Sequence, residues 1–374
     1  MKTKNLYLLV FIFGLLSWSC SKTSLVNTNP ATAVSLKSSL TQGVQDLSSA
    51  VTSITTSAGY QVVNGPTDLL TKSAVVSPWD TVTHSVLLAD IAGVYDYKAT
   101  QVKRNHMPSI MRFFNKTKDS TLMVIRLPEE KVKASKKMFT YSPSDTLLTN
   151  NYKITVSDYQ VRTSHATGSS YEMASAINIK GVAAGTYKIT TSQNKTTGYH
   201  FASEFDFPNG FVTKCYYTPG DTAVSVYSIS DGTKVLYEEK YTAIKSATDN
   251  KHREKEFSLT IGNVEIVRQL GHSQASLDSA KVYVAGVLQL KSKVEIVDKT
   301  TDPTADKTDD CISNQKRDLK ITFDDGTTKT LSELTGSVIT DISALFTSLR
   351  EANFGTAIID WIAGDIYFKK LMGI

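Results

Sequence analysis

Residues 199–241 read YHFASEFDFPNGFVTKCYYTPGDTAVSVYSISDGTKVLYEEKY, and this stretch decides the fold. Its apolar and polar side chains alternate between three turn-forming groups, Asn209-Gly210, Pro219-Gly220-Asp221 and Ser230-Asp231-Gly232. Asn-Gly and Asp-Gly readily adopt the positive φ angles that two-residue hairpins require. Alternation with a period of two places the aromatic side chains on one face, as in an antiparallel meander that is exposed on one side.

The same pattern extends in both directions along the chain. It predicts a central meander over 171–241, with strands at 171–180, 186–193, 199–207, 211–218, 223–230 and 234–241. Shorter strands are predicted before the meander at 94–97, 121–127 and 152–161, and after it at 257–261, 264–270, 319–323 and 328–331. Residues 281–297 are expected to form a further hairpin around Gly286.

Helices are predicted near both ends of the chain. Residues 34–54 and 338–351 carry apolar side chains at three- and four-residue steps, which defines one buried face on each helix. A further helix is predicted at 80–92, with Asp80 as its N-cap. The apolar segment 358–371 is expected to pack against the core, and the basic segment 131–137 is expected to be a solvated turn.

These elements predict an α+β fold with a large curved antiparallel β-meander and N-terminal and C-terminal amphipathic helices packed on it. The chain has 374 residues, and we expect one folded domain over 34–374. Its formal charge of +5 is mild and no extended basic stripe occurs, so nucleic acid is not an expected partner.

The N-terminus has the anatomy of an export signal. Two lysines precede the short apolar run 6–16, which small residues and Cys20 follow. A Cys in this place resembles a bacterial lipobox, which implies a signal peptide over 1–19, acylation of Cys20 and a polar tether over 20–33. The alternative is a plain signal peptide with an incidental Cys.

The segments LLADIAGVYDY (87–97) and YKITVSDY (152–159), together with this relaxed lipobox and the long meander, resemble a group of uncharacterised Bacteroidota lipoproteins. The resemblance implies an outer-membrane protein anchored by its lipid, with no activity or catalytic residues to carry over. Because no acidic cluster follows Cys20, we expect the protein to face the periplasm.

A short motif is similar to the O-glycosylation acceptor of exported Bacteroidota proteins. It consists of Asp, then Ser or Thr, then an apolar residue or Thr. The acceptors would be Thr81, Ser120, Thr146, Thr222 and Ser279.

No catalytic or metal-binding constellation is evident in the sequence. The histidines are scattered without H-E-x-x-H spacing, and the acidic loop 298–311 lacks the Gly that a calcium loop needs at its sharp turn. We therefore expect no metal and no cofactor. Cys215 and Cys311 are either a disulfide pair, as an oxidising compartment would allow, or two separate thiols.

The leading hypothesis is a non-enzymatic, lipid-anchored envelope protein. Its partners would be the membrane, through the lipid, and a hydrophobic ligand, a glycan or another envelope protein. A structural or adhesive subunit of the fimbrial type and a periplasmic hydrolase are the alternatives.

Overall fold

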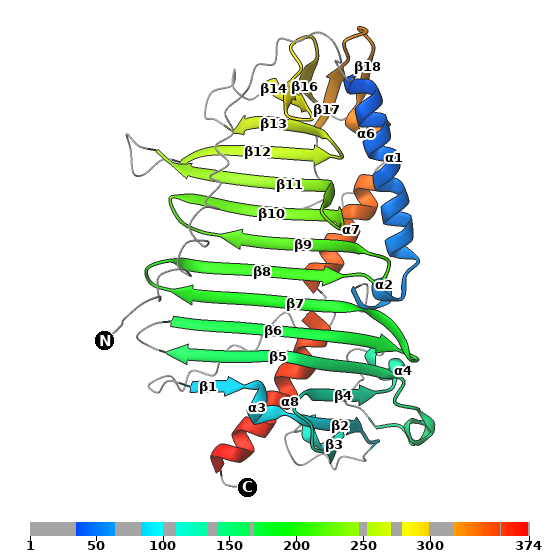
Figure 1. Cartoon of the computed structure of the whole chain (residues 1–374), viewed down its shortest axis with the longest axis vertical. Coiled ribbons are helices and arrows are strands. Elements are labelled where there is room, and N and C mark those ends of the chain that lie inside the picture. Colours follow the sequence, from blue (N-terminus) through cyan, green and yellow to red (C-terminus); the bar gives the residue numbers. More distant parts are fainter. Residues whose placement is uncertain are drawn as a thin grey trace, which may run out of the picture.

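The computed structural model confirms an α+β fold dominated by one very large antiparallel sheet (Figure 1). The described part of the chain comprises residues 35–63, 84–99, 110–133, 141–164, 168–246, 253–270, 279–298, 317–351 and 353–372. The predicted signal peptide, Cys20 and the whole of the predicted tether lie outside these residues.

Eighteen strands of the described part belong to the sheet. They are β1 (His84–Leu87), β2 (Gly93–Tyr97), β3 (Phe114–Lys118), β4 (Met123–Leu127), β5 (Tyr152–Ser164), β6 (Gly168–Ile179), β7 (Val182–Asn194), β8 (Gly198–Asp206), β9 (Phe211–Thr218), β10 (Thr222–Asp231), β11 (Lys234–Lys245), β12 (Arg253–Ile261), β13 (Val264–Leu270), β14 (Ser279–Val284), β15 (Val287–Leu288), β16 (Lys293–Asp298), β17 (Arg317–Thr322) and β18 (Thr328–Thr330).

The long strands β5 to β13 follow one another across the sheet in chain order, each antiparallel to the last. The predicted meander is therefore confirmed as β6–β11. Its turns contain Gly210 at φ 89° and Gly232 at φ 56°, the left-handed backbone that the Asn-Gly and Asp-Gly pairs predicted. Beyond β5, β4 pairs with one half of its edge and β1 with the other.

Helices α7 and α8 run behind the sheet in the view of Figure 1, and α1 lies along the ends of the strands at the right. We call the face covered by α7 and α8 the helix face, and the opposite side the open face. The helical elements are α1 (Leu36–Thr55), α2 (Ala58–Val63), α3 (Leu88–Ile91), η2 (Ile110–Arg112), α4 (Glu129–Lys133), η4 (Pro143–Leu147), α6 (Leu331–Thr335), α7 (Val338–Glu351) and α8 (Asn353–Met372). Among the described helices, none has the length and apolarity needed to cross a membrane.

Helix α1 packs closely against the end of the β12–β13 hairpin. Its predicted apolar stripe is confirmed, since Leu36, Leu40 and Leu47 are at most 1% exposed. A Cβ at Gly43 would lie 2.9 Å from the carbonyl oxygen of Ile261, so only glycine permits this approach. At the other end of the chain, α7 and α8 bury apolar side chains in the same core, as predicted.

The prediction of a helix over 80–92 is wrong at residues 84–87 and confirmed only at 88–91. Residues 84–87 form β1, and only Leu88–Ile91 is helical. His84–Leu87 pairs with the edge of β5 that β4 leaves open, from Gln160 to Thr163. Backbone pairing with a distant strand has therefore overridden the local helical periodicity.

The prediction of a solvated basic turn at 131–137 is also wrong where the chain is described. Lys131 lies in α4 and is 5% exposed, and its Nζ donates to Asp145 Oδ2 at 2.6 Å. The same ammonium lies 6.0 Å from the ring centre of Tyr97. Both charged side chains of this ion pair are 7% exposed, so the charges stabilise one another largely without water.

Helix α8 is fixed to the sheet by a carboxylate. Asp360 Oδ1 accepts hydrogen bonds from the hydroxyls of Tyr159 on β5 and Tyr171 on β6, both at 3.1 Å. The two rings meet edge to face, with centroids 5.9 Å apart. Burial raises the pKa of Asp360 to about 6, although both tyrosine hydrogen bonds lower it.

Removing one member of the Lys131–Asp145 pair is expected to destabilise the fold. Lys131→Ala should lower the free energy of unfolding by about 3 kcal/mol, because it leaves a buried carboxylate without its counter-charge. Urea unfolding would measure this. Lys37→Ala is the control, because Lys37 makes a solvent-exposed ion pair with Asp325 whose loss should destabilise the fold far less. Equal effects of the two substitutions would contradict the prediction.

Asp360 should make stability fall as the pH rises. The folded chain retains a proton up to about pH 6, whereas the unfolded carboxyl releases it near its ordinary pKa of 3.8. The free energy of unfolding should therefore drop by about 3 kcal/mol between these values. Asp360→Asn should be more stable than the native chain at pH 7.5 and lose this advantage by pH 4.

The matched control for this prediction is Asp365→Asn on the same helix. Asp365 accepts a hydrogen bond from the backbone N–H of Met111 at 3.2 Å. Urea titrations at both pH values would compare the two variants with the native chain. A stability difference for Asp360→Asn that is the same at pH 4 and pH 7.5 would refute the assignment.

Candidate functional site

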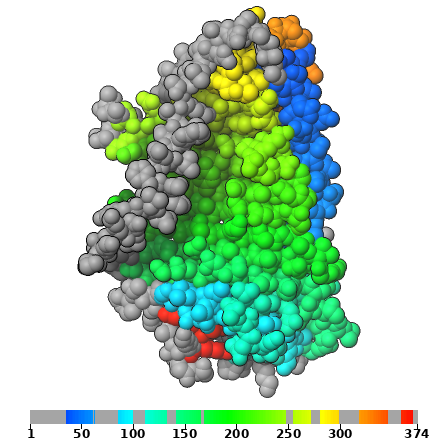
Figure 2. Space-filling model, in the orientation of Figure 1, coloured from blue at the N-terminus to red at the C-terminus, as the bar shows by residue number. Residues whose placement is uncertain are grey.

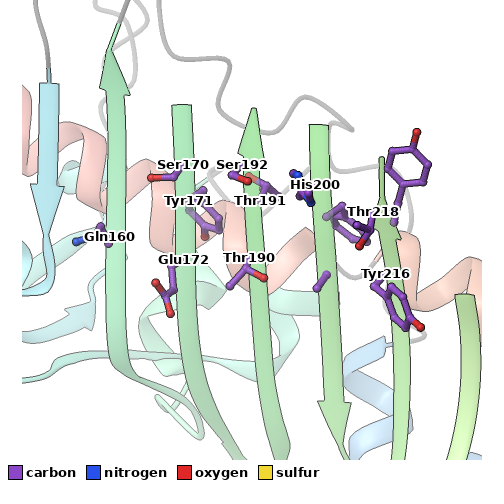
Figure 3. Close-up of a pocket in the computed structure, with 13 residues that line it drawn as sticks. Gln160, Ser170, Tyr171, Glu172, Thr190, Thr191, Ser192, His200, Tyr216 and Thr218 are labelled. Carbon is purple, nitrogen blue, oxygen red and sulfur yellow. The ribbon is translucent and has the colours of Figure 1, made fainter. Parts of the chain in front are cut away.

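The open face carries a hollow of about 430 Å³ over strands β5 to β9 (Figure 3). The space-filling view shows that this face is recessed over the central strands (Figure 2). The hollow is lined by Gln160, Ser170, Tyr171, Glu172, Thr190, Thr191, Ser192, His200, Phe201, Ala202, Tyr216, Tyr217 and Thr218.

Strand register arranges the open-face lining in rows. In the first row, Gln160 lies opposite Glu172, Glu172 opposite Thr190, Thr190 opposite Ala202, and Ala202 opposite Tyr216. This row crosses four strand spacings, a span of roughly 19 Å. A second row places Ser170 opposite Ser192, and Ser192 opposite His200.

The hollow exists because a small residue occupies the middle of the first row. Directly opposed side chains in a sheet approach within about 5 Å, so large neighbours normally cover the backbone between them. Ala202 offers only a methyl group between Thr190 and Tyr216. Its side chain therefore forms a low floor, and the phenol of Tyr216 forms one wall.

The polar lining is not committed to internal hydrogen bonds. Within the described part of the chain, the side chains of Gln160, Glu172, Thr190, His200 and Tyr216 make no hydrogen bond or ion pair with one another or with other residues. Burial, and then the charge of Glu238, raises the pKa of Tyr216, so its hydroxyl remains neutral at ordinary pH and can both donate and accept.

Next to the hollow, the same face is fully paired. Lys188 contacts Glu204 at 2.8 Å and Lys214 contacts it at 2.7 Å, while Thr186 donates to Asp206 at 2.8 Å. Burial alone would raise the pKa of Glu204, but its hydrogen bonds from the two lysines lower it overall. The paired side chains around Glu204 therefore form a cross-strand ladder that stabilises the sheet. The polar groups of the neighbouring hollow remain available to a ligand.

Four of the lining residues point their side chains to the helix face, because side chains alternate along a strand. They are Tyr171, Thr191, Phe201 and Tyr217, which lie opposite one another on β6 to β9. Tyr171 is the residue that donates to Asp360 on α8. The strand segment beneath the hollow is thus fixed by the docking of α8 on its other side.

The geometry supports binding better than catalysis. Ser192 and His200 are cross-strand neighbours, but no hydrogen bond joins them in the described structure, and Glu172 forms no hydrogen bond or ion pair with either of them. A nucleophile and its base are expected within hydrogen-bond reach. Across the described ranges, no cluster of three or more His, Cys, Asp or Glu side chains is arranged to hold a metal ion.

The residues singled out from the sequence do not converge on this hollow. Thr222 is exposed at the start of β10, and Thr146 is exposed in η4 with its hydroxyl donating to the carbonyl of Pro143. Ser120 is partly buried and accepts from the N–H of Leu122, and Ser279 begins β14. Thr81 lies outside the described residues. Glycosylation at all five positions stays a prediction.

The cysteine prediction also stays open. Cys215 lies on β9 with its side chain on the helix face, partly buried and opposite Ser203 and Tyr227. Cys311 and the acidic loop around it lie outside the described residues. Cys20 lies outside them as well, so the structure does not bear on acylation.

Comparison of the chain with protein-family models, with curated proteins and with solved structures gave no match. The candidate site therefore depends on geometry alone. The sequence does contain a signal for it, since polar residues and alanine take the open-face positions 190, 192, 200 and 202 in two adjacent predicted strands.

Proposed function

We propose that this protein is a lipid-anchored, non-catalytic binding protein of the bacterial outer membrane, facing the periplasm, whose hollow takes a hydroxyl-rich ligand such as an oligosaccharide. The observation that carries the proposal is the uncommitted set of hydroxyl, amide, carboxylate and imidazole groups beside the ring of Tyr216. Such groups exchange hydrogen bonds with sugar hydroxyls, and an aromatic ring offers a flat apolar surface for a sugar ring.

An oligosaccharide suits this hollow better than a hydrophobic ligand. Sites for apolar molecules are mainly lined by apolar side chains, with a few polar groups to fix orientation. Here eight of the nine open-face side chains that line the hollow carry a hydroxyl, amide, carboxylate or imidazole group, and the row from Gln160 to Tyr216 is elongated rather than closed. These features support an extended polar chain as the occupant.

The alternatives receive less support. A fimbria-type subunit would exchange an edge strand with a neighbouring subunit. Here the edge strand β3 has two exposed lysines, Lys116 and Lys118, and charged side chains on an edge strand disfavour pairing with another chain. A periplasmic hydrolase would need converging carboxylates or a Ser/His pair in its cleft. Glu172 is the one carboxylate among the residues that line the hollow, and no hydrogen bond joins Ser192 to His200 in the described part of the chain. The export signal and Cys20 support the location and the anchor.

The ligand proposal is tested with Tyr216→Ala and Ala202→Leu. The first variant removes the aromatic wall of the hollow, and a contact with an aromatic ring contributes on the order of 1 kcal/mol. The second fills the floor without removing any polar group. Both variants should weaken binding to oligosaccharides from bacterial envelope glycans, measured by glycan array and then by isothermal titration calorimetry.

The matched control is Tyr241→Ala. Tyr241 is 36% exposed against 37% for Tyr216, but it lies on β11 with its side chain on the helix face. This variant should bind like the native chain. No glycan binding by the native protein, or equal losses in all three variants, would overturn the proposal.

The anchor proposal is tested in cells with Cys20→Ser. Acylation places lipid on the thiol, and serine cannot form the thioether. Metabolic labelling with palmitate should be lost, and the protein should leave the outer-membrane fraction. Cys215→Ser is the control and should retain both. Labelling that survives Cys20→Ser would contradict acylation at this residue.

A further inference from the structure

The hairpin formed by β14 and β15 exposes apolar side chains at and just after its turn. Val287 is 39% exposed, Leu288 37% and Leu290 83%. Val282 and Val284, a few residues earlier on β14, are 2% and 3% exposed. The hairpin therefore changes from core residues to exposed apolar residues within one turn.

The turn itself holds this tip in place. Ala285 and Gly286 both have positive φ, 50° and 80°, as in a tight two-residue hairpin turn. Val284 pairs with Val287, and Tyr283 pairs with Leu288. The N–H of Gln289 donates to the carbonyl of Val282 at 2.9 Å, so the chain stays attached to β14 just before Leu290.

Lysines flank the apolar tip on both sides in the sequence. From Lys281 to Lys293 the sequence is KVYVAGVLQLKSK, which has three lysines and no acidic residue. Lys281, Lys291 and Lys293 are all exposed, and Lys293 makes an ion pair with Glu295. Exposed acids are close by, on the turn after β17, where Asp325 is held by Lys37 at 2.8 Å.

The hairpin lies at the end of the molecule where α1 begins. The contact between Lys37 and Asp325 ties the first turn of α1 to the β17–β18 turn. Lys293 is the cross-strand partner of Thr322, three residues before Asp325, so the hairpin adjoins the same turn. Figure 1 shows β14, β16, β18 and the start of α1 together at one end. Helix α1 therefore begins beside the hairpin.

We propose that this hairpin is a membrane-contact site that inserts Leu290, with Val287 and Leu288, into the interface of an anionic lipid bilayer. Lysines near an anionic surface gain electrostatic attraction, and an apolar side chain gains by leaving water. The proposed acylation of Cys20 would decide which membrane leaflet the protein faces and would hold the hairpin near that leaflet. The affinity of the hairpin itself for lipid does not depend on acylation.

The chemistry favours lipid over a protein partner. A bilayer interface accepts leucine among acyl chains while lysines remain at the phosphates, which is the arrangement of an interfacial anchor. A short apolar tip of three side chains is small for a stable protein interface, which buries about 800 Å² on each partner.

The test uses tryptophan as a depth probe in the full-length protein. Leu290→Trp is compared with Leu147→Trp, because Leu147 is 84% exposed but lies in η4, next to β5 and far from the hairpin. Each variant is reconstituted into vesicles of phosphatidylethanolamine and phosphatidylglycerol whose acyl chains are brominated. The emission of the native chain gives the background.

Leu290→Trp should add emission that brominated chains quench, whereas Leu147→Trp should add emission that they do not. Reversing charge with Lys281→Glu and Lys291→Glu should reduce the quenching at position 290. Equal quenching of the two tryptophans, or none at either, would overturn the proposal and leave the hairpin as a surface for another protein.

The same samples separate this inference from the proposed function. Flotation of the native protein with vesicles, together with its intact mass, shows whether Cys20 is acylated. An acylated protein that floats while position 290 stays unquenched refutes the hairpin site alone. A protein without acyl chains whose position 290 is quenched on added vesicles refutes the anchor alone.

Discussion

The hydrogen-bonded register from β5 to β13 is the constraint on which the rest of this structure depends. Because side chains alternate with a period of two, a shift of one residue in any strand would exchange its two faces. One parity of positions on each strand supplies the core beneath the helices, and the other supplies the open face. The hollow and the docking of α8 are thus two consequences of the same alignment.

A bulge in β5 shows how finely this alignment is set. The register with β6 shifts between Val156 and Asp158, so Ser157 is an extra residue. Ile154 and Val156 face the helices before the bulge, and Tyr159 faces them after it. If β5 alternated regularly through Ser157 with no bulge, Tyr159 would point to the open face and could not reach Asp360. Gln160 would then leave the hollow, so this one bulge sets the side chains of both faces.

The sequence was sufficient for the meander because its signals are local. Turn residues at Asn209-Gly210 and Asp231-Gly232 mark the strand ends, and alternation assigns the faces between them. Elsewhere, interactions between residues far apart in the sequence decide the structure, and local patterns do not predict it. The periodicity of residues 84–87 suits a helix, but the open edge of β5 takes them as a strand. Nothing near Lys131 in the sequence reveals that Asp145 neutralises it in the core.

The hollow could not be predicted from the sequence, for a related reason. Gln160, Glu172, Thr190, Ala202 and Tyr216 come from five strands, and they share a row only through four registers and a bulge. Alternation alone indicates which of them face the open side. It does not indicate that Ala202 falls opposite both Thr190 and Tyr216, which is what creates the depression.

The two proposed sites also constrain one another through the sheet. Strand β7, in the middle of the hollow, lies seven strand positions from β14, a separation of roughly 34 Å along the long axis. A protein resting on a bilayer through the β14–β15 hairpin would hold its hollow about that far from the lipid. This is farther than the headgroup layer extends from the hydrocarbon, which is on the order of 5–10 Å. The ligand would therefore come from the aqueous phase and not from the lipid surface, which agrees with the polar groups that line the hollow.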